Sequence, residues 1–307
     1  MFFKDSFYVK GQYVFEAQIY SYWRKLQMTW LKGPVTPLIF FLVFTLLSNC
    51  SDNQVDTGNN SEDQAAEKIF NSGEKEILRK RYSDAAEKFT EVERLYPYSD
   101  WAKRALIMQV YSYHKDKAYD KVVSAANRFI EFHPNDNDVP YAYYLIGLSY
   151  YDRVLAIGRD QELAKEALKV FNLIKEEYPE SEYASNSEIR FNFLRDHLAS
   201  KEMEVGRYYL KRAHYAPAIN RFRGVIEEFS TTSQVPEALH RLVEAYLSLG
   251  LVNEAQTAGA ILGYNYRSTD WYDRTFDLLG SKGLKPKSSG NNWLNQIYRQ
   301  VVKGQWL

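Results

Sequence analysis

The feature that most constrains the fold of this chain is an internal repeat. The pattern Tyr-x-x-Ala-x-x-x-Phe occurs five times, complete or in degenerate form. Its first positions lie 37 residues apart from Tyr82 to Tyr119 and again from Tyr215 to Val252, close to the step of about 34 residues in tetratricopeptide repeats. The copies are Tyr82/Ala85/Phe89, Tyr119/Val122/Ala126, Ala164/Ala167/Phe171, Tyr215/Ala218/Phe222 and Val252/Ala255/Gly259.

Each copy begins the second helix of a predicted helix pair. The Ala is small where two antiparallel helices approach closely, and the Phe fills the space one turn later. Pairs such as Tyr96-Pro97 then end the helix. The predicted first helices span Ala66–Arg81, Trp101–Lys117, Tyr141–Val154, Ala184–Leu198 and Pro236–Leu249. Residues 65–280 are therefore predicted to form an all-α, right-handed solenoid of five tetratricopeptide-like helix pairs.

The spacing also bears on the alternatives to a regular solenoid. A plain helical bundle is possible, but the two equal steps of 37 residues disfavour it. The two middle intervals, from Tyr119 to Ala164 and on to Tyr215, are longer, which predicts insertions in and after the third repeat.

Composition excludes several classes of protein. Lys and Arg number 39 and Asp and Glu number 39, so the chain lacks the basic surplus that nucleic-acid binding requires. A single cysteine excludes a disulfide framework. The five His are scattered without metal-ligand spacing, and no nucleophile or phosphate-loop motif occurs. We therefore predict no enzymatic activity, no catalytic residues and no metal or soluble cofactor.

The N-terminal part reads as a targeting segment. An apolar run of ten residues, 38–47, is too short to span a bilayer, which needs about 20 residues, but suits a signal peptide. Translation from Met28 would give a signal peptide of ordinary length, residues 28–49. Residues 1–27 are then interpreted as a mis-annotated upstream extension, because they contain acidic residues and many aromatic ones.

The apolar run ends in Leu47-Ser48-Asn49-Cys50, which resembles the lipobox of bacterial lipoproteins. That resemblance implies cleavage before Cys50 and attachment of diacylglycerol and an N-acyl chain to its thiol and amine. Asn49 departs from the small residue usual at this position. A signal anchor with an inert Cys50 is the alternative. Residues 50–64 would form a polar, lipidated tether.

The body resembles one particular lipoprotein family. The segments that carry the resemblance are GRDQ at 158–161, YPESEYA at 178–184, LRDHLA at 194–199, EVGRYYLKR at 204–212, AINRF at 218–222 and EAYLSLGL at 244–251. On these segments the chain is similar to the BamD (ComL) family of outer-membrane assembly lipoproteins over about residues 65–279. The resemblance implies a non-enzymatic scaffold at the periplasmic face of the outer membrane, with BamA, the other assembly-machinery subunits and unfolded outer-membrane β-barrel proteins as partners.

Candidate contact residues follow from the repeats. Tyrosines of the first helices would line a substrate groove, because tyrosine combines an apolar ring with a hydroxyl, although many of them would pack between repeats. These are Tyr111, Tyr143, Tyr144 and Tyr150. Arg207, Lys211 and Arg212 form a basic face that would bind BamA or, alternatively, form salt bridges with Glu202 and Glu204. The alternative function is that of a tetratricopeptide lipoprotein that coordinates peptidoglycan synthesis or cell division, because such a protein would share the lipobox and the repeats.

Residues 281–307 form a basic tail with five cations and no Asp or Glu. Its apolar residues follow a helical stripe, so the tail is predicted to be an amphipathic helix. The stripe consists of Trp293, Leu294, Ile297, Tyr298, Val301 and Val302. It would dock on the last repeat, on a partner or on an anionic membrane, and the thin basic face favours the body or a partner.

Overall fold

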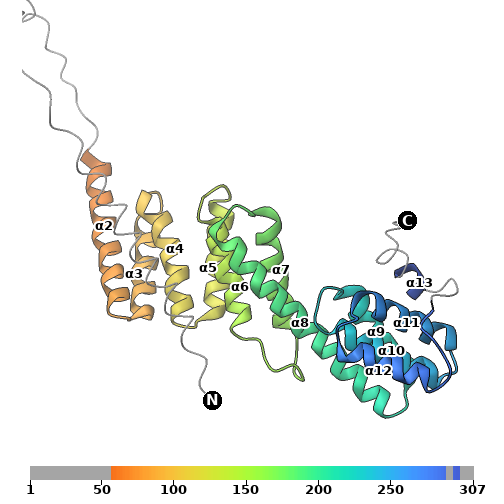
Figure 1. Ribbon diagram of the computed structural model, residues 1–307. Helices are drawn as coiled ribbons and strands as arrows, with labels where there is room; N and C mark the ends of the chain where they lie inside the picture. Colours follow the sequence, from red (N-terminus) through yellow and green to blue (C-terminus); the bar gives the residue numbers. More distant parts are fainter. Residues whose placement is uncertain (1–56, 288–292, 298–307) are drawn as a thin grey trace, which may run out of the picture. The chain divides into compact units, whose positions relative to one another are not determined.

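The computed structural model describes residues 57–287 and 293–297 of the protein (Figure 1). Regular structure in these residues is helical and no strand occurs among them, so the all-α prediction is confirmed. None of the described helices is long and apolar enough to cross a membrane. The predicted signal peptide and Cys50 lie outside the described residues, and the helix that begins at Thr57 takes up residues 57–64 of the predicted tether 50–64.

The five predicted helix pairs are present, and two shorter helices follow them (Figure 1). From α2 to α12, each helix packs against the next one in the chain. First helices also contact one another in the row α2, α4, α6, α8, α10 and α12. The bounds are α2 Thr57–Leu78, α3 Tyr82–Leu95, α4 Asp100–Lys115, α5 Tyr119–Phe132, α6 Val139–Tyr151, α7 Glu162–Glu177, α8 Glu182–Lys211, α9 Tyr215–Glu228, α10 Val235–Ser248, α11 Val252–Asn265, α12 Asp270–Gly280 and α13 Trp293–Ile297.

The repeated Phe is buried because a glycine of the first helix faces it. Its ring is fully buried in the first, third and fourth pairs. A Cβ added to Gly206 would lie 2.4 Å from Cε1 of Phe222, so only glycine allows this approach of α8 and α9. The corresponding contacts are Gly73 with Phe89, Gly147 with Phe171 and Gly206 with Phe222.

The turn inside four of the five pairs uses a left-handed backbone. Lys80, Lys117, Ala213 and Gly250 have φ angles of 61°, 60°, 60° and 75°. The first two are 37 residues apart and so are the last two, so the repeat extends to the turn geometry. Only glycine adopts this conformation without steric cost, and three of these turns therefore carry local strain.

The two longer intervals have different structural causes. After α6 the chain makes a loop over residues 152–161, inside which the Gln161 side-chain amide donates hydrogen bonds to the carbonyls of Ala156, Ile157 and Arg159. The other insertion extends α8 to Lys211, so the predicted end at Leu198 is wrong. The helix continues because residues 199–211 keep an apolar face.

Helix α8 consequently belongs to two hydrophobic clusters. Leu194 and Leu198 pack with residues of α7. Ala199 and Met203 pack in the cluster built mainly from α9, α10 and α11. All four side chains are buried, so a single helix carries core residues of both clusters.

Two elements follow the fifth pair. Helix α12 packs on α10 and α11, where a sixth first helix would lie. Residues 284–287 and 293–297, which we together name the C-terminal strap, return over α11: the Lys287 amide donates to the Gln256 carbonyl at 3.2 Å, and the Gln256 side chain donates to the Lys285 carbonyl at 2.8 Å. Trp293 and Leu294 pack into the last cluster, so the described start of the predicted apolar stripe docks on the body. Residues 298–307 lie outside the description.

Candidate partner-binding surfaces

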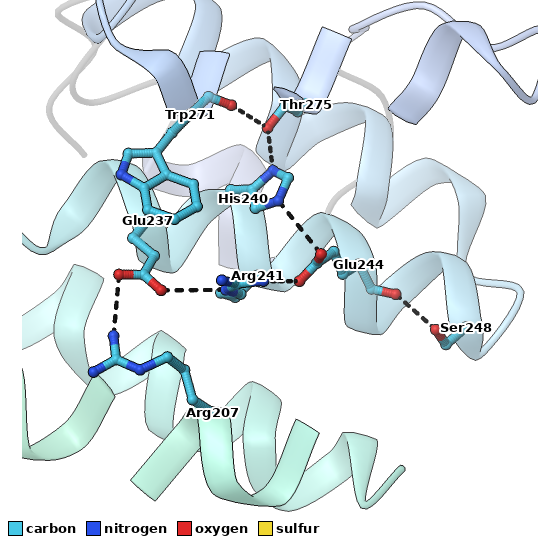
Figure 2. A network of polar contacts seen from close by, with 8 residues as sticks. All are labelled: Arg207, Glu237, His240, Arg241, Glu244, Ser248, Trp271 and Thr275. Carbon is cyan, nitrogen blue, oxygen red and sulfur yellow. Dashed lines mark hydrogen bonds and ion pairs between the residues drawn. The ribbon is translucent and has the colours of Figure 1, made fainter. Parts of the chain in front are cut away.

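A chain of ion pairs connects α8 to α10 (Figure 2). Arg207 Nη1 on α8 lies 3.0 Å from Glu237 Oε2 on α10. The other oxygen of Glu237 is 3.2 Å from Arg241 Nε, and Arg241 Nη1 is 2.8 Å from Glu244 Oε2. Glu237 and Arg241 are one turn apart on α10, which fixes their side chains on the face that α8 packs against.

The same network reaches α12 through a buried histidine. His240 Nε2 is 3.4 Å from Glu244 Oε1, and its Nδ1 is 2.8 Å from the Thr275 hydroxyl. The same hydroxyl donates a hydrogen bond to the Trp271 carbonyl at 2.7 Å. Three first helices are therefore joined by polar contacts around His240, which is only 5% exposed.

The carboxylate of Glu244 is held in its charged form. Burial acts to raise its pKa, but hydrogen bonds from His240 and Arg241 outweigh burial and bring the pKa below its ordinary value of 4.5. For Arg241, burial acts to lower the pKa, and the carboxylates of Glu244 and Glu237 outweigh it and raise the pKa. Glu244 and Arg241 therefore keep their charges at neutral pH.

An open groove of about 460 Å³ lies over this network. Its lining consists of Arg207, Leu210, Lys211, Tyr215, Arg241, Glu244 and Ser248. The lining carries three cations and one carboxylate and includes apolar surface from Leu210 and Tyr215. Such a groove suits a partner segment that presents acidic and apolar side chains together.

The three basic residues predicted to bind a partner differ in their surroundings. Arg207 is paired with Glu237, and Arg212 stacks on the Tyr208 ring at 4.0 Å and also contacts its hydroxyl. Lys211 is exposed and lines the groove. The structure therefore places Arg207 and Lys211 on one groove and turns Arg212 toward its own helix.

The salt bridges expected within α8 are not the ones observed. Glu202 pairs with Arg221 of α9, and Glu204 pairs with Lys201. Sequence reasoning missed Glu237 as the partner of Arg207, because a contact between helices has no fixed sequence spacing. The spacing of Glu237, Arg241 and Glu244 was the available signal, since residues three and four apart share a helix face.

The four candidate substrate tyrosines lie on α4 and α6 and are half-buried. Tyr143 lies 6.0 Å from the ring of Tyr178, and burial raises the pKa of its hydroxyl. The Tyr144 ring lies 5.1 Å from that of Tyr183. Lys115 stacks on Tyr111 at 5.5 Å, and Arg153 stacks on Tyr150 at 5.6 Å. These rings both pack between repeats and keep part of their surface open.

In residues 57–287 and 293–297, no group of three or more His, Cys, Asp or Glu could hold a metal ion. In the α8–α10 groove, Arg207, Arg241 and Glu244 are engaged in ion pairs and Lys211 is exposed. The groove has a charge pattern and a shape that a partner segment could complement.

Comparison with known proteins gives consistent matches. The family model YfiO, described as an outer membrane lipoprotein, matches residues 62–261. An "Outer membrane protein assembly factor BamD" from Caulobacter vibrioides is 36% identical over 253 residues, covering 82% of this chain and 83% of the relative. The protein of the same name from Rickettsia prowazekii is 38% identical over 211 residues, covering 69% and 84%. That of Neisseria meningitidis is 30% identical over 216 residues, covering 67% and 81%.

Proposed function

The chain belongs to the YfiO family of outer membrane lipoproteins, whose relatives are BamD outer membrane protein assembly factors, and we propose that it is a lipid-anchored, non-enzymatic scaffold of the β-barrel assembly machinery. Family membership over nearly the whole helical body carries this proposal. As an outer membrane protein assembly factor, the protein is associated with the outer membrane. The comparisons give no support to the alternative role in peptidoglycan synthesis or cell division.

The anchor in this proposal is Cys50. It is the single cysteine of the chain and stands where the apolar run of the signal peptide ends. Cleavage before Cys50, followed by attachment of diacylglycerol and an N-acyl chain, would hold the body at the periplasmic face, since several acyl chains anchor stably where one does not. Mass spectrometry of the mature N-terminus should find an acylated Cys50. An unmodified Cys50 still joined to Asn49 would refute the anchor.

The α8–α10 groove is the proposed contact with BamA. It combines the exposed ammonium of Lys211 with a fixed row of ion pairs, so a partner meets a preorganised, positively charged surface. Preorganisation lowers the entropy lost on binding, and charge complementarity selects an acidic partner segment. Arg212 lies beside the groove and contributes charge to the approach.

Charge reversal tests this contact. Lys211→Glu with Arg212→Glu should lower co-purification of BamA about tenfold, since like charges facing each other across an interface oppose binding. The matched control is Lys165→Glu, at a lysine of α7 whose side chain is 59% exposed. Arg207 is left intact because its reversal would place a second carboxylate beside Glu237. Equal co-purification of the double variant and wild type would reduce Lys211 and Arg212 to solvated surface.

The row of first helices is the proposed site for unfolded β-barrel proteins. Half-buried tyrosine rings on α4 and α6 offer apolar surface and hydroxyls to an extended segment. Tyr150→Ala should weaken cross-linking to an unfolded barrel protein, whereas Tyr98→Ala, at an exposed tyrosine between α3 and α4, should not. Circular dichroism checks that both variants remain folded. Equal loss in both variants would contradict a tyrosine-specific site.

A further inference from the structure

The C-terminal strap places a Trp–Leu pair, Trp293 and Leu294, in a site formed by side chains of the last repeats. The Trp293 indole Nε1 donates a hydrogen bond to the Tyr246 hydroxyl on α10 at 3.3 Å. The guanidinium of Arg223 on α9 stacks on the same ring at 4.8 Å. Tyr246 is 4% exposed, so the acceptor of the indole proton is a buried polar group with a fixed position. The ring is therefore recognised on its face and at its edge.

The neighbouring residue fills an apolar position. Leu294 is completely buried in the cluster formed by α9, α10, α11 and α12. Full burial of a leucine side chain stabilises the seated pair, because it removes apolar surface from water. Together with Trp293, it gives the strap two adjacent anchors of different chemistry: an aromatic ring held by a cation and a hydroxyl, and an aliphatic side chain held by burial.

We propose that this site is a peptide-binding site for an aromatic–aliphatic pair, occupied in cis by Trp293 and Leu294, and that a partner segment carrying such a pair displaces the strap. The helix that seats the pair is only five residues long, Trp293–Ile297, and cannot hold itself in place without its anchors. A partner segment must therefore bind this site tightly enough to compete with the strap, which is tethered to the same chain.

The sequence around the pair fits an exchangeable occupant. Residues 288–292 read SSGNN and provide no apolar side chain between the backbone contacts at Lys287 and the anchor at Trp293. Ser, Gly and Asn are typical of linker segments. The chain also ends in a second Trp–Leu pair, Trp306-Leu307, which supplies a matched control because its composition is identical.

A competition experiment on the full-length protein tests the proposal. A fluorescent peptide of residues 288–302 should bind the Trp293→Ala/Leu294→Ala variant about tenfold more tightly than wild type, because a segment tethered at an effective concentration of roughly 1 mM competes with a peptide whose Kd is roughly 0.1 mM. The Trp306→Ala/Leu307→Ala control should bind like wild type. Peptide carrying both alanine replacements should not bind. If the vacated variant is folded and does not bind, Trp293 and Leu294 are a permanent cap and the proposal is wrong.

A second variant leaves both anchors native. Inserting ten Gly and Ser residues after Ser289 lengthens the link from five residues to fifteen, which lowers the effective concentration of the strap about fivefold. Peptide binding should tighten accordingly, and unchanged binding would overturn the proposal. Light scattering of the wild-type protein should find monomers. A wild-type dimer that the Trp293→Ala/Leu294→Ala change dissociates would instead mean that the strap of a second copy occupies the site. The inference rests on the proposed function only for the source of the competing segment, so failure of peptide binding leaves the assembly-factor role untouched.

Discussion

The contact between Gly206 and Phe222 leads to a prediction in which two matched substitutions have opposite signs. Gly206→Ala places a methyl group 2.4 Å from Cε1 and 2.8 Å from Cδ1 of Phe222, a ring that is fully buried. Gly224→Ala, on the adjacent helix α9, meets no atom within 4 Å. Both glycines are inside helices, so both substitutions share the same change in helix propensity.

The magnitudes follow from these distances. Replacing glycine by alanine inside a helix stabilises it by about 1 kcal/mol. At Gly206 the ring must shift within a packed core, which costs roughly 1–3 kcal/mol. We therefore expect Gly224→Ala to raise the free energy of unfolding by about 1 kcal/mol and Gly206→Ala to lower it by up to about 2 kcal/mol. The difference between the two variants isolates the contact with Phe222.

Urea unfolding followed by far-ultraviolet circular dichroism measures both effects. In a Phe222→Leu background, Gly206→Ala should lower the free energy of unfolding by less than it does in the wild type. The smaller leucine side chain accommodates the added methyl group. A repeat protein can unfold in more than one step, so the comparison uses the transition that both variants shift. Equal stabilisation by the two single substitutions would refute the close-approach argument for the repeat.

Three further predictions concern the turns, the polar network and the tail. Ala213→Gly should raise the free energy of unfolding by about 1 kcal/mol in the same urea assay, since φ there is 60°, whereas Ala216→Gly in the first turn of α9 should not raise it. The folded-state pKa of Glu244 lies below 4.5, so the stability that its charged form contributes is complete above pH 4.5 and is lost as the pH falls through the lowered pKa. The difference in free energy of unfolding between wild type and Glu244→Gln should therefore shrink on acidification below pH 4.5. A difference that stays constant would contradict the network. Deleting residues 288–307 should lower the unfolding midpoint, because it removes the buried Leu294, and should leave membrane fractionation unchanged; release from membranes would contradict an anchor at Cys50 alone.

The helix pairs could be predicted because the residues that form the repeat are also the ones that pack. Ala85 and Phe89 are both fully buried at the contact between two helices, so their spacing carries the geometry of the pair. The glycine facing the Phe could have been found too, since Gly73 and Phe89 are 16 residues apart, as are Gly206 and Phe222. The pairing of Arg207 with Glu237 could not, because it depends on how α8 crosses α10.

The length of α8 has a consequence for how the protein unfolds. In a solenoid, stability is a sum of repeat terms and nearest-neighbour terms, so separate sections can lose structure separately. Helix α8 adds a covalent element to one such boundary, because Leu198 and Ala199 are consecutive in the chain and belong to different clusters. One cluster can therefore unfold its part of α8 while the other keeps its part only if the helical hydrogen bonds around Leu198 and Ala199 break. Phe229 also packs against both clusters, so the cooperativity between the two sections depends on α8 together with this ring, and thermal or mechanical disruption of the middle of α8 would weaken it.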